Sequence, residues 1–416
     1  MTALLRANWA WLLVASALAL FATTTLFNLP LWLMAVLGLW RSVRAPRRLI
    51  HDRAAALLGL LFLCVWLPML LALPDAVNPE RSLQTTLPYL HLYFAGLFIL
   101  GALGDEAVLK KLEWFVFAVI TIWCLDALLQ FLSGADLFGY PYKPGQLSGM
   151  FHPKLRLGHA LAVLAPLYLD LIRRTAPGRP WLWLFALLLL AVILLSGKRV
   201  AWIMAFAGCA AWAAALLYRT RSIAWGRVTG GGIVIAIALG IIVATHEPLA
   251  RRIETTLGVF SGDLEEFDRA TARRLSVWNT ALGMARENRI NGVGPRGFRY
   301  AYRDHAAADD YFVLRGGGSQ THPHQMLLEV AAETGFIGLF GIAAFWWLLL
   351  RRGWTALRAG NRAVPWILCT GVAWLPLNAH LAFYGSYWSS AIWWLLACAL
   401  AATERAASGP RAWPAT

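Results

Sequence analysis

Long apolar segments separated by short polar connections recur along almost the whole chain. A helix that crosses a bilayer needs about 20 predominantly apolar residues, and runs near that length appear repeatedly with few charged residues inside them. We therefore predict twelve transmembrane helices, of which the first two are the tightest fit, with 34 residues between Arg6 and Arg41. The predicted spans cover residues 7–24, 27–40, 54–73, 88–103, 113–133, 158–172, 181–196, 200–218, 228–245, 326–350, 363–378 and 387–403.

The composition agrees with this pattern. Of the 416 residues, 59% are hydrophobic and 14% are charged, whereas soluble proteins average about 45–50% apolar and about 25% charged residues. The chain is therefore predicted to be an all-α polytopic membrane protein.

The basic residues predict how the helices are oriented. Cytoplasmic loops of membrane proteins are rich in Lys and Arg, and 20 of the 37 basic residues fall in the segments that we place inside, against six in the short outside segments. Both termini are therefore expected inside the cell. Most of the net charge of +15 is then an orientation signal, and we expect no nucleic acid as a partner.

One connection is far longer than the others. Residues 246–325 form an outside segment of about 80 residues, in which helical spacing within residues 269–288 predicts at least one amphipathic helix. The turn cluster at residues 291–297 ends that helix. The chain thus divides into transmembrane helices 1–9 (residues 1–245), a large, partly helical loop (246–325), and helices 10–12 with a short cytoplasmic tail (326–416).

The long loop contains 11 arginines, no lysine and ten acidic residues. Its net charge near +1 excludes a polybasic anchor, and a solvated, salt-bridged surface explains most single arginines. The exclusive use of arginine nevertheless favours phosphate binding, because the planar guanidinium binds phosphate through two hydrogen bonds. Arg269 and Arg273 are four residues apart and would share one helix face, and Arg274 follows directly.

A second unusual cationic site is the short outside connection S-G-K-R at residues 196–199. Positive charge is disfavoured there by the orientation. Lys198 and Arg199 are therefore either anchors whose long side chains reach the membrane surface, or cations that neutralise an anionic group there. Lys154 and Arg156, in another outside segment, are further candidates for binding a lipid substrate.

Titratable groups cluster where the tenth span begins. His322 and His324 flank a proline just before the span, and Glu329 and Glu333 follow on one face of the predicted helix. Carboxylates inside a span are costly, so each needs a partner or a function. A histidine, with its ordinary pKa of about 6.5, can act as a general base. A lone histidine is usually structural, but three unusual sites on one membrane face favour a functional site.

Metal chemistry is not indicated. The cysteines show no disulfide framework and no metal-ligand spacing, and the outside loops carry no H-E-x-x-H or D-x-D cluster. We expect no metal and no cofactor. All five cysteines lie in predicted spans: Cys64, Cys124, Cys209, Cys369 and Cys398.

Taken in order, these segments resemble a known family. The S-G-K-R connection, an R-L-x-x-W stretch (residues 274–278) followed by N-G-V-G-P (291–295), and an H-Q-x-x-L…E-T-G stretch (324–335) are similar to the O-antigen ligase and polymerase superfamily. The motifs cover about 40 residues. Two positions depart from the usual pattern: Gln325 replaces an asparagine and Lys198 replaces a serine, which leaves open whether Lys198 or Arg199 is the principal ligand.

The resemblance implies a GT-C-like fold in the bacterial inner membrane, with about 12 transmembrane helices, a helical periplasmic subdomain and an active site on the periplasmic side. It implies an O-antigen ligase that moves a glycan from undecaprenyl diphosphate to a lipid A-core sugar and inverts the anomeric carbon. Membrane lipids are then further partners of the protein. The alternatives are an O-antigen polymerase, a protein O-oligosaccharyltransferase, and a transporter or flippase of lipid-linked sugars.

The resemblance also implies residue roles. His324 would take the proton from the acceptor hydroxyl, and Glu333 would orient it. Arg199 and Arg274 would hold the diphosphate. Lys198 and Arg273 would assist them, and the further supporting residues are His322, Gln325, Arg269, Lys154 and Arg156.

Overall fold

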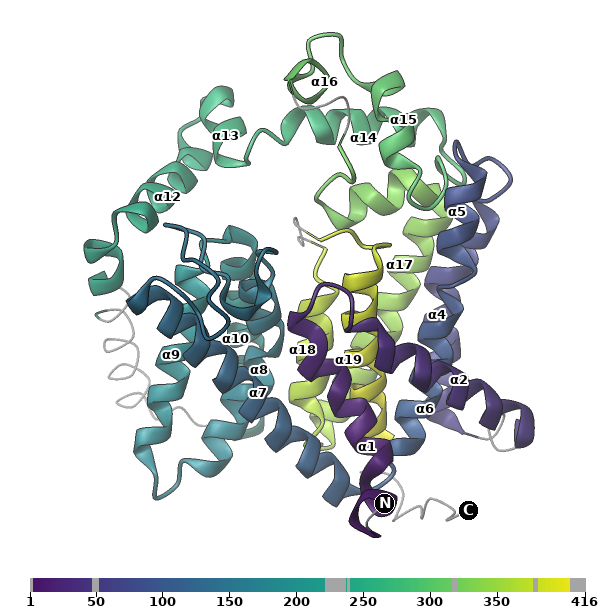
Figure 1. Ribbon diagram of the computed structural model, residues 1–416. Helices are drawn as coiled ribbons and strands as arrows, with labels where there is room; N and C mark the ends of the chain where they lie inside the picture. Colours follow the sequence, from purple (N-terminus) through teal and green to yellow (C-terminus); the bar gives the residue numbers. More distant parts are fainter. Residues whose placement is uncertain are drawn as a thin grey trace.

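The computed structural model describes residues 3–46, 52–220, 237, 240–315, 320–376 and 381–404. Helices make up most of these ranges, which contain two isolated β-bridges and no strand. Figure 1 shows the long helices side by side, with α12 to α16 lying across one end of the bundle, which we call the upper end. The all-α prediction is confirmed.

The chain is a membrane protein. Among the described residues, five helical segments are long and apolar enough to cross a bilayer: residues Arg53–Leu71, Pro79–Ala102, Glu106–Ser133, Arg199–Thr220 and Met326–Arg358. Helices occupy eleven of the twelve predicted spans, and the predicted span 228–245 lies mostly outside the described residues. The total of twelve crossings stays a prediction.

The helices have the following bounds. They are α1 (Ala3–Ala19), η1 (Leu20–Ala22), α2 (Asn28–Arg44), α4 (Arg53–Leu71), α5 (Pro79–Thr86), α6 (Leu90–Ala102), α7 (Glu106–Ser133), η2 (Gly149–Phe151), α8 (Leu157–Thr175), η3 (Pro180–Leu182), α9 (Trp183–Leu195), α10 (Arg199–Thr220), α12 (Glu247–Leu257), η4 (Gly258–Phe260), α13 (Leu264–Ala270), α14 (Leu275–Glu287), α15 (Phe298–His305), α16 (Tyr311–Arg315), α17 (Met326–Arg358), α18 (Val364–Ala373) and α19 (Ser386–Glu404).

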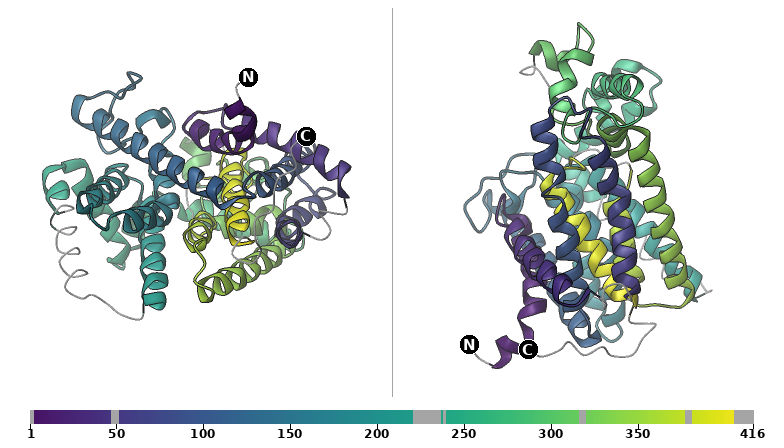
Figure 2. Two further views of the ribbon diagram at one scale, coloured as in Figure 1. Left: turned by 90° about the horizontal axis from the view of Figure 1, so that it is seen from below. Right: turned by 90° about the vertical axis from the view of Figure 1, so that its right-hand side faces the viewer.

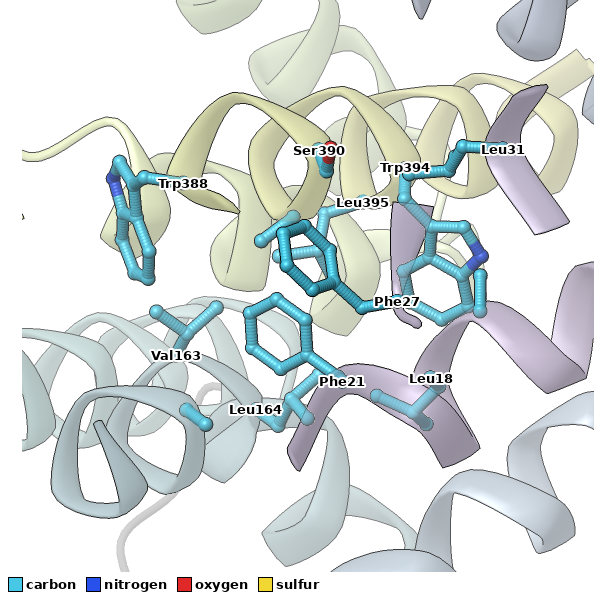
Figure 3. Close-up of a pocket in the computed structure, with 13 residues that line it drawn as sticks. Leu18, Phe21, Phe27, Leu31, Val163, Leu164, Trp388, Ser390, Trp394 and Leu395 are labelled. Carbon is cyan, nitrogen blue, oxygen red and sulfur yellow. The ribbon is translucent and has the colours of Figure 1, made fainter. Parts of the chain in front are cut away.

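The interior is closely packed around α8 and α19. Every residue of α8 from Leu157 to Ile172 is buried, and α19 packs against α4, α6 and α18, as the two views of Figure 2 show. Phe21 stacks on Tyr387 with ring centroids 4.4 Å apart. The apolar cavity beside these rings, bordered by α8 and α19 (Figure 3), has a volume of only about 30 Å³. Little room is therefore left inside this part of the bundle.

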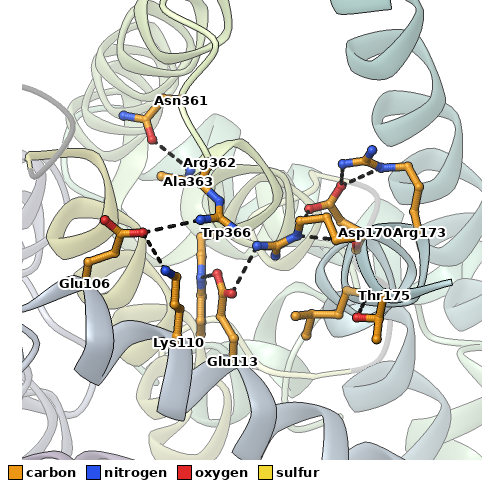
Figure 4. Close-up of polar contacts among 12 residues, drawn as sticks. Glu106, Lys110, Glu113, Asp170, Arg173, Thr175, Asn361, Arg362, Ala363 and Trp366 are labelled. Carbon is orange, nitrogen blue, oxygen red and sulfur yellow. Dashed lines mark hydrogen bonds and ion pairs between the residues drawn. The ribbon is translucent and has the colours of Figure 1, made fainter. Parts of the chain in front are cut away.

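Charged groups at the lower end of the bundle are paired (Figure 4). Arg174 reaches Asp170 at 2.9 Å and Glu113 at 3.2 Å, and Arg173 also pairs with Asp170 at 2.9 Å. A second group joins Glu106 to Lys110 and Arg362. These four cations, Lys110, Arg173, Arg174 and Arg362, thus have nearby carboxylates.

The predicted tenth span is not one continuous helix. α17 is interrupted at Gly335, whose φ of 61° and ψ of −155° are not helical. Beyond the break, the amide of Phe336 donates to the carbonyl of Arg289 at 2.8 Å and that of Ile337 to Ile290 at 3.2 Å. A sequence-distant loop therefore replaces the helical hydrogen bonds, and residues 326–334 form a separate short helix.

The break requires a glycine. A Cβ added at Gly335 would overlap the Ile290 carbonyl and the Asn291 nitrogen, and positive φ is costly for other residues. Just before the break, the Val293 amide donates to the Ala332 carbonyl at 2.8 Å. We call this backbone pairing of residues 289–293 with residues 332–337 the α17 joint. It unites the N-G-V-G-P and E-T-G stretches.

The amphipathic helix expected within residues 269–288 is present as α14, but the helix face predicted for Arg269 and Arg273 is wrong. α13 ends at Ala270 and α14 begins at Leu275, with Arg273 at a φ of 58° between them. The cause is Asp268, whose carbonyl accepts from the Arg273 amide at 2.7 Å and whose carboxylate accepts from the Leu275 amide at 3.1 Å. Arg269 and Arg273 therefore do not share a helix face.

The α17 joint can be tested with two glycine substitutions. Gly335→Ala is expected to lower the free energy of unfolding by about 1–3 kcal/mol, because it strains the backbone and pushes the joint apart. Gly371→Ala in α18 is the control, since an added Cβ meets nothing within 4 Å there. Thermal unfolding in detergent measures both. Equal melting temperatures for the two variants would contradict the claim that the α17 joint requires a glycine at position 335.

Candidate functional site

The S-G-K-R turn between α9 and α10 is held from two sides. Gly197 has a φ of 66°, and an added Cβ there would overlap the carbonyl of Gly145 in the loop above it. From α12, Arg252 donates from Nη1 to the Gly197 carbonyl at 2.5 Å. The turn is therefore clamped between a loop and the upper-end helices, and this fixes the direction of Lys198 and Arg199.

Cations from three separate segments lie within electrostatic range of this turn. Burial lowers the pKa of Lys198 to about 8, with the charges of Arg252 and Arg274 adding to the effect. Burial also lowers the pKa of Arg274 to about 10, and the charge of Arg199 contributes. We call Lys198, Arg199, Arg252 and Arg274 the cation cluster.

The cation cluster differs from the charged groups at the lower end. Within the described ranges, no carboxylate forms an ion pair with any of its members. His159, fully buried in α8, lies close enough to Lys198 and Arg274 to be affected by their charges. Like charges held together in partly buried surroundings are unfavourable without an opposite charge. The cluster therefore suits an anionic ligand.

A tryptophan connects the cation cluster to the histidine segment. Arg274 precedes the first residue of α14, and Trp278 follows one turn later. The indole Nε1 of Trp278 donates to the carbonyl of Pro323 at 3.1 Å. Since Pro323 lies between the two histidines, the R-L-x-x-W stretch directly supports the H-P-H segment.

The two histidines face each other. The ring centroids of His322 and His324 are 4.0 Å apart with an interplanar angle of 51°, and His322 Nδ1 lies 2.9 Å from the Thr321 hydroxyl. His324 has a φ of 56°, a conformation that is uncommon outside glycine and that often occurs at functional sites.

Gln325 anchors the histidine segment to the bundle. Its side-chain oxygen accepts from the Leu328 amide at 2.6 Å and caps α17, while its Nε2 donates to the Pro376 carbonyl at 3.1 Å. A side-chain amide can make both bonds at once. Gln325 therefore fixes the start of α17 and its distance from the end of α18.

Residues 184–343 match the family model described as O-Antigen ligase, and no curated protein matches the chain. This segment is similar to the O-antigen ligase superfamily. The matched residues contain the S-G-K-R turn, all of α14, the histidine pair and the α17 joint. The resemblance seen in the sequence is thus confirmed at the level of the superfamily.

In the segment that matches the family model, the buried carboxylates bind loop backbones. Glu333 accepts from the Arg296 amide at 2.6 Å and from the Phe298 amide at 3.4 Å. Glu329 accepts from the amides of residues 383 and 384, at 3.0 and 3.2 Å. The partners expected for carboxylates at this position are therefore backbone donors. Both oxygens of Glu333 hold the loop, and its orientation of His324 stays a hypothesis.

The remaining predicted site residues make contacts other than those of the cation cluster. Lys154 and Arg156 line a cavity of about 700 Å³ together with Arg81, Arg296 and His322. Arg273 places its guanidinium 4.7 Å from the ring centroid of Tyr311 in α16. Arg269 lies near the end of α13. The structure thus groups Lys198, Arg199 and Arg274 in the cation cluster, whereas Lys154 and Arg156 line the cavity.

Sequence reasoning missed Arg252 and Arg296. Arg252 is one of eleven arginines in the long loop, and no spacing distinguishes it. Its bond to Gly197 spans 55 residues, so only the tertiary position of α12 reveals it. Arg296 lies in the turn cluster that follows α14, where its positive φ of 62° has no sequence signal.

The electrostatics of the cation cluster predict how Lys198 titrates. Its amine should be half deprotonated near pH 8, so the cluster holds its full charge below that pH and loses one charge above it. Arg274→Gln should raise the pKa of Lys198, because a neighbouring positive charge is removed. The pH dependence of amine acylation, followed residue by residue with mass spectrometry, measures this. Arg273→Gln is the control, and an equal effect of both substitutions would refute the cluster.

Proposed function

We propose that this protein is an O-antigen ligase. It moves the O-antigen glycan from undecaprenyl diphosphate to a sugar of lipid A-core, at the periplasmic face of the bacterial inner membrane. The reaction is a metal-independent, inverting glycosyl transfer. Its topology has twelve transmembrane helices, with residues 246–325 as the large periplasmic loop between residues 1–245 and residues 326–416.

The observation that carries the proposal is the cation cluster without carboxylate partners among the described residues, joined through Trp278 to the histidine pair. The leaving group of the reaction is a diphosphate, whose negative charge grows as the glycosidic bond breaks. Guanidinium and ammonium donors at that position stabilise the transition state more than the ground state. Arg199 and Arg274 hold the diphosphate, and Lys198 and Arg252 assist. These donors supply the charge that a metal ion would otherwise provide.

His324 is proposed to act as the general base. Its imidazole takes the proton of the acceptor hydroxyl, the hydroxyl oxygen bonds to the anomeric carbon, and the bond from that carbon to the diphosphate oxygen breaks. Undecaprenyl diphosphate leaves with the bonding electrons. Direct displacement inverts the anomeric carbon. The strained conformation of His324 and its contact with His322 support this role, with His322 as a neighbour that tunes or positions it.

The position of the cationic groups favours an enzyme over a transporter. Transporters place their binding groups near the membrane midplane between two related halves. Here the cation cluster and the histidines gather at the upper end, around the ends of α9, α14 and α17. An O-antigen polymerase would use the same donor chemistry, and only the acceptor distinguishes it from a ligase.

The lipopolysaccharide of a ligase-deleted Gram-negative strain with a compatible core tests the proposal. The wild-type gene should restore long-chain bands. His324→Ala should remove them, because loss of a general base costs about 10²–10⁴-fold in rate, and Arg274→Ala should do the same by weakening the hold on the diphosphate. His322→Ala should retain appreciable transfer.

Lys110→Ala is the control for expression and for the loss of a cation, since Lys110 pairs with Glu106 at the lower end. Long-chain bands restored by His324→Ala but lost with His322→Ala would reverse the assignment of the base. Bands that never appear with the wild-type protein, while the glycan accumulates on a carrier that matches the donor, would refute the ligase.

A further inference from the structure

A cavity lined by a second group of cations lies beside the histidine pair. This cavity of about 700 Å³ is lined by residues of α5, of the segment before α8, of the loop after α14 and of the start of α19. Its volume falls in the range of about 300–1,000 Å³ that is usual for ligand sites. Its cations are Arg81, Lys154, Arg156 and Arg296, and its aromatic residues include Tyr89, Tyr384 and Tyr387.

The wall of this cavity is positive. None of the described residues that line it is acidic. The two nearest buried carboxylates, Glu329 and Glu333, lie within electrostatic range of Arg296, but both accept hydrogen bonds from backbone amides. In the described structure Nη1 of Arg296 is buried and has no hydrogen-bond partner. At least one guanidinium donor of Arg296 thus has no hydrogen-bond partner within the described structure.

Arg156 is held in place for such contact. Its guanidinium carbon lies 3.6 Å from the ring centroid of Tyr387, a cation–π contact that fixes the long side chain without neutralising it. The side chain of Arg156 is half-buried, so its charge is partly removed from water, and this burial lowers its pKa. Rigid, partly desolvated guanidinium groups bind phosphate more strongly than freely moving ones.

The cavity and the cation cluster meet at the histidine pair. His322 borders the cavity, its ring centroid is 4.0 Å from that of His324, and Trp278 links the intervening Pro323 to the start of α14, where Arg274 lies. A molecule in the cavity would thus reach the proposed base from the side of His322, whereas the cluster is joined to the histidine pair through Trp278.

We propose that this cavity is the acceptor site, and that it recognises the acceptor through phosphate groups carried on its saccharide. The inference rests on the proposed function. Cations from three segments fit an acceptor with more than one phosphate, since each phosphate can accept several charged hydrogen bonds. The tyrosine rings offer amphipathic surfaces for the sugar itself. One anion site then serves the donor and a second serves the acceptor.

The test compares acceptors with and without phosphate. The double variant Arg81→Gln/Lys154→Gln removes two lining cations that make no ion pair within the described structure. Lys143→Gln is the matched control, because Lys143 is exposed in the same loop as Lys154 and lies outside the cavity lining. The full-length proteins are placed in phosphatidylcholine nanodiscs. Binding of lipid A-core is measured before and after its phosphates are removed with hydrofluoric acid.

Wild-type protein and the Lys143→Gln control should bind the phosphorylated acceptor at least about tenfold more tightly than the dephosphorylated one, as expected for lost hydrogen bonds between charged groups. The double variant should lose most of that preference. A preference that the double variant retains in full would overturn the proposal.

Phosphate on a membrane lipid is the other source of the same chemistry. Phosphatidylglycerol added to the nanodiscs should compete weakly with lipid A-core. Competition at equal concentrations, together with no preference for the phosphorylated saccharide, would make the cavity a lipid headgroup site and overturn the acceptor assignment.

Turnover separates the two proposals. If wild-type protein transfers glycan, the double variant should show about a tenfold higher KM for the acceptor and an unchanged KM for the donor. If wild-type protein transfers glycan and the double variant has the same KM for the acceptor, the acceptor-site proposal alone is refuted. Wild-type protein that transfers nothing would refute the ligase, while the binding comparison would still decide the cavity.

Discussion

Backbone hydrogen bonds across the α17 joint position the upper end of the molecule. The chain leaves helical geometry at Gly335, and the loop at residues 289–293 supplies the missing partners. Glu333, just before the break, fixes the rest of that loop through the amides of Arg296 and Phe298. A break that is satisfied by another segment costs little, because no buried polar group is left unpaired.

The α17 joint helps to position two groups of cations next to the histidine pair. They are the cation cluster and the cations of the cavity wall. α14 leads into the joint, so its first turn, next to Arg274, is held in a fixed direction relative to α17. The same loop carries Arg296 to the wall of the large cavity. Among the described residues, no cation of the cluster or of the cavity wall forms an ion pair with a carboxylate, whereas the four lower-end cations of Figure 4 do. A protein that gathers like charges in this way gains stability when an anion binds.

Much of this arrangement follows from the sequence. Apolar periodicity locates the helices, and the positions of Lys198, Arg199 and Arg274 in otherwise unusual surroundings are enough to indicate an anion site. The break between Arg269 and Arg273 could not be foreseen, because alanine and arginine favour helix and the deciding bonds come from Asp268. Arg252 and the cavity were missed because they depend on contacts between segments far apart in the chain. For Glu333 the expected role was toward His324, whereas its observed bonds hold a loop.

The most direct test of the account is a cryo-electron microscopy structure of the protein with undecaprenyl diphosphate bound in a lipid nanodisc. The account predicts that the phosphate groups contact Lys198, Arg199 and Arg274, with the prenyl chain directed into the lipid and the large cavity left to the acceptor. A diphosphate seated against Arg81, Lys154 and Arg156, or one that touches no member of the cation cluster, would contradict it.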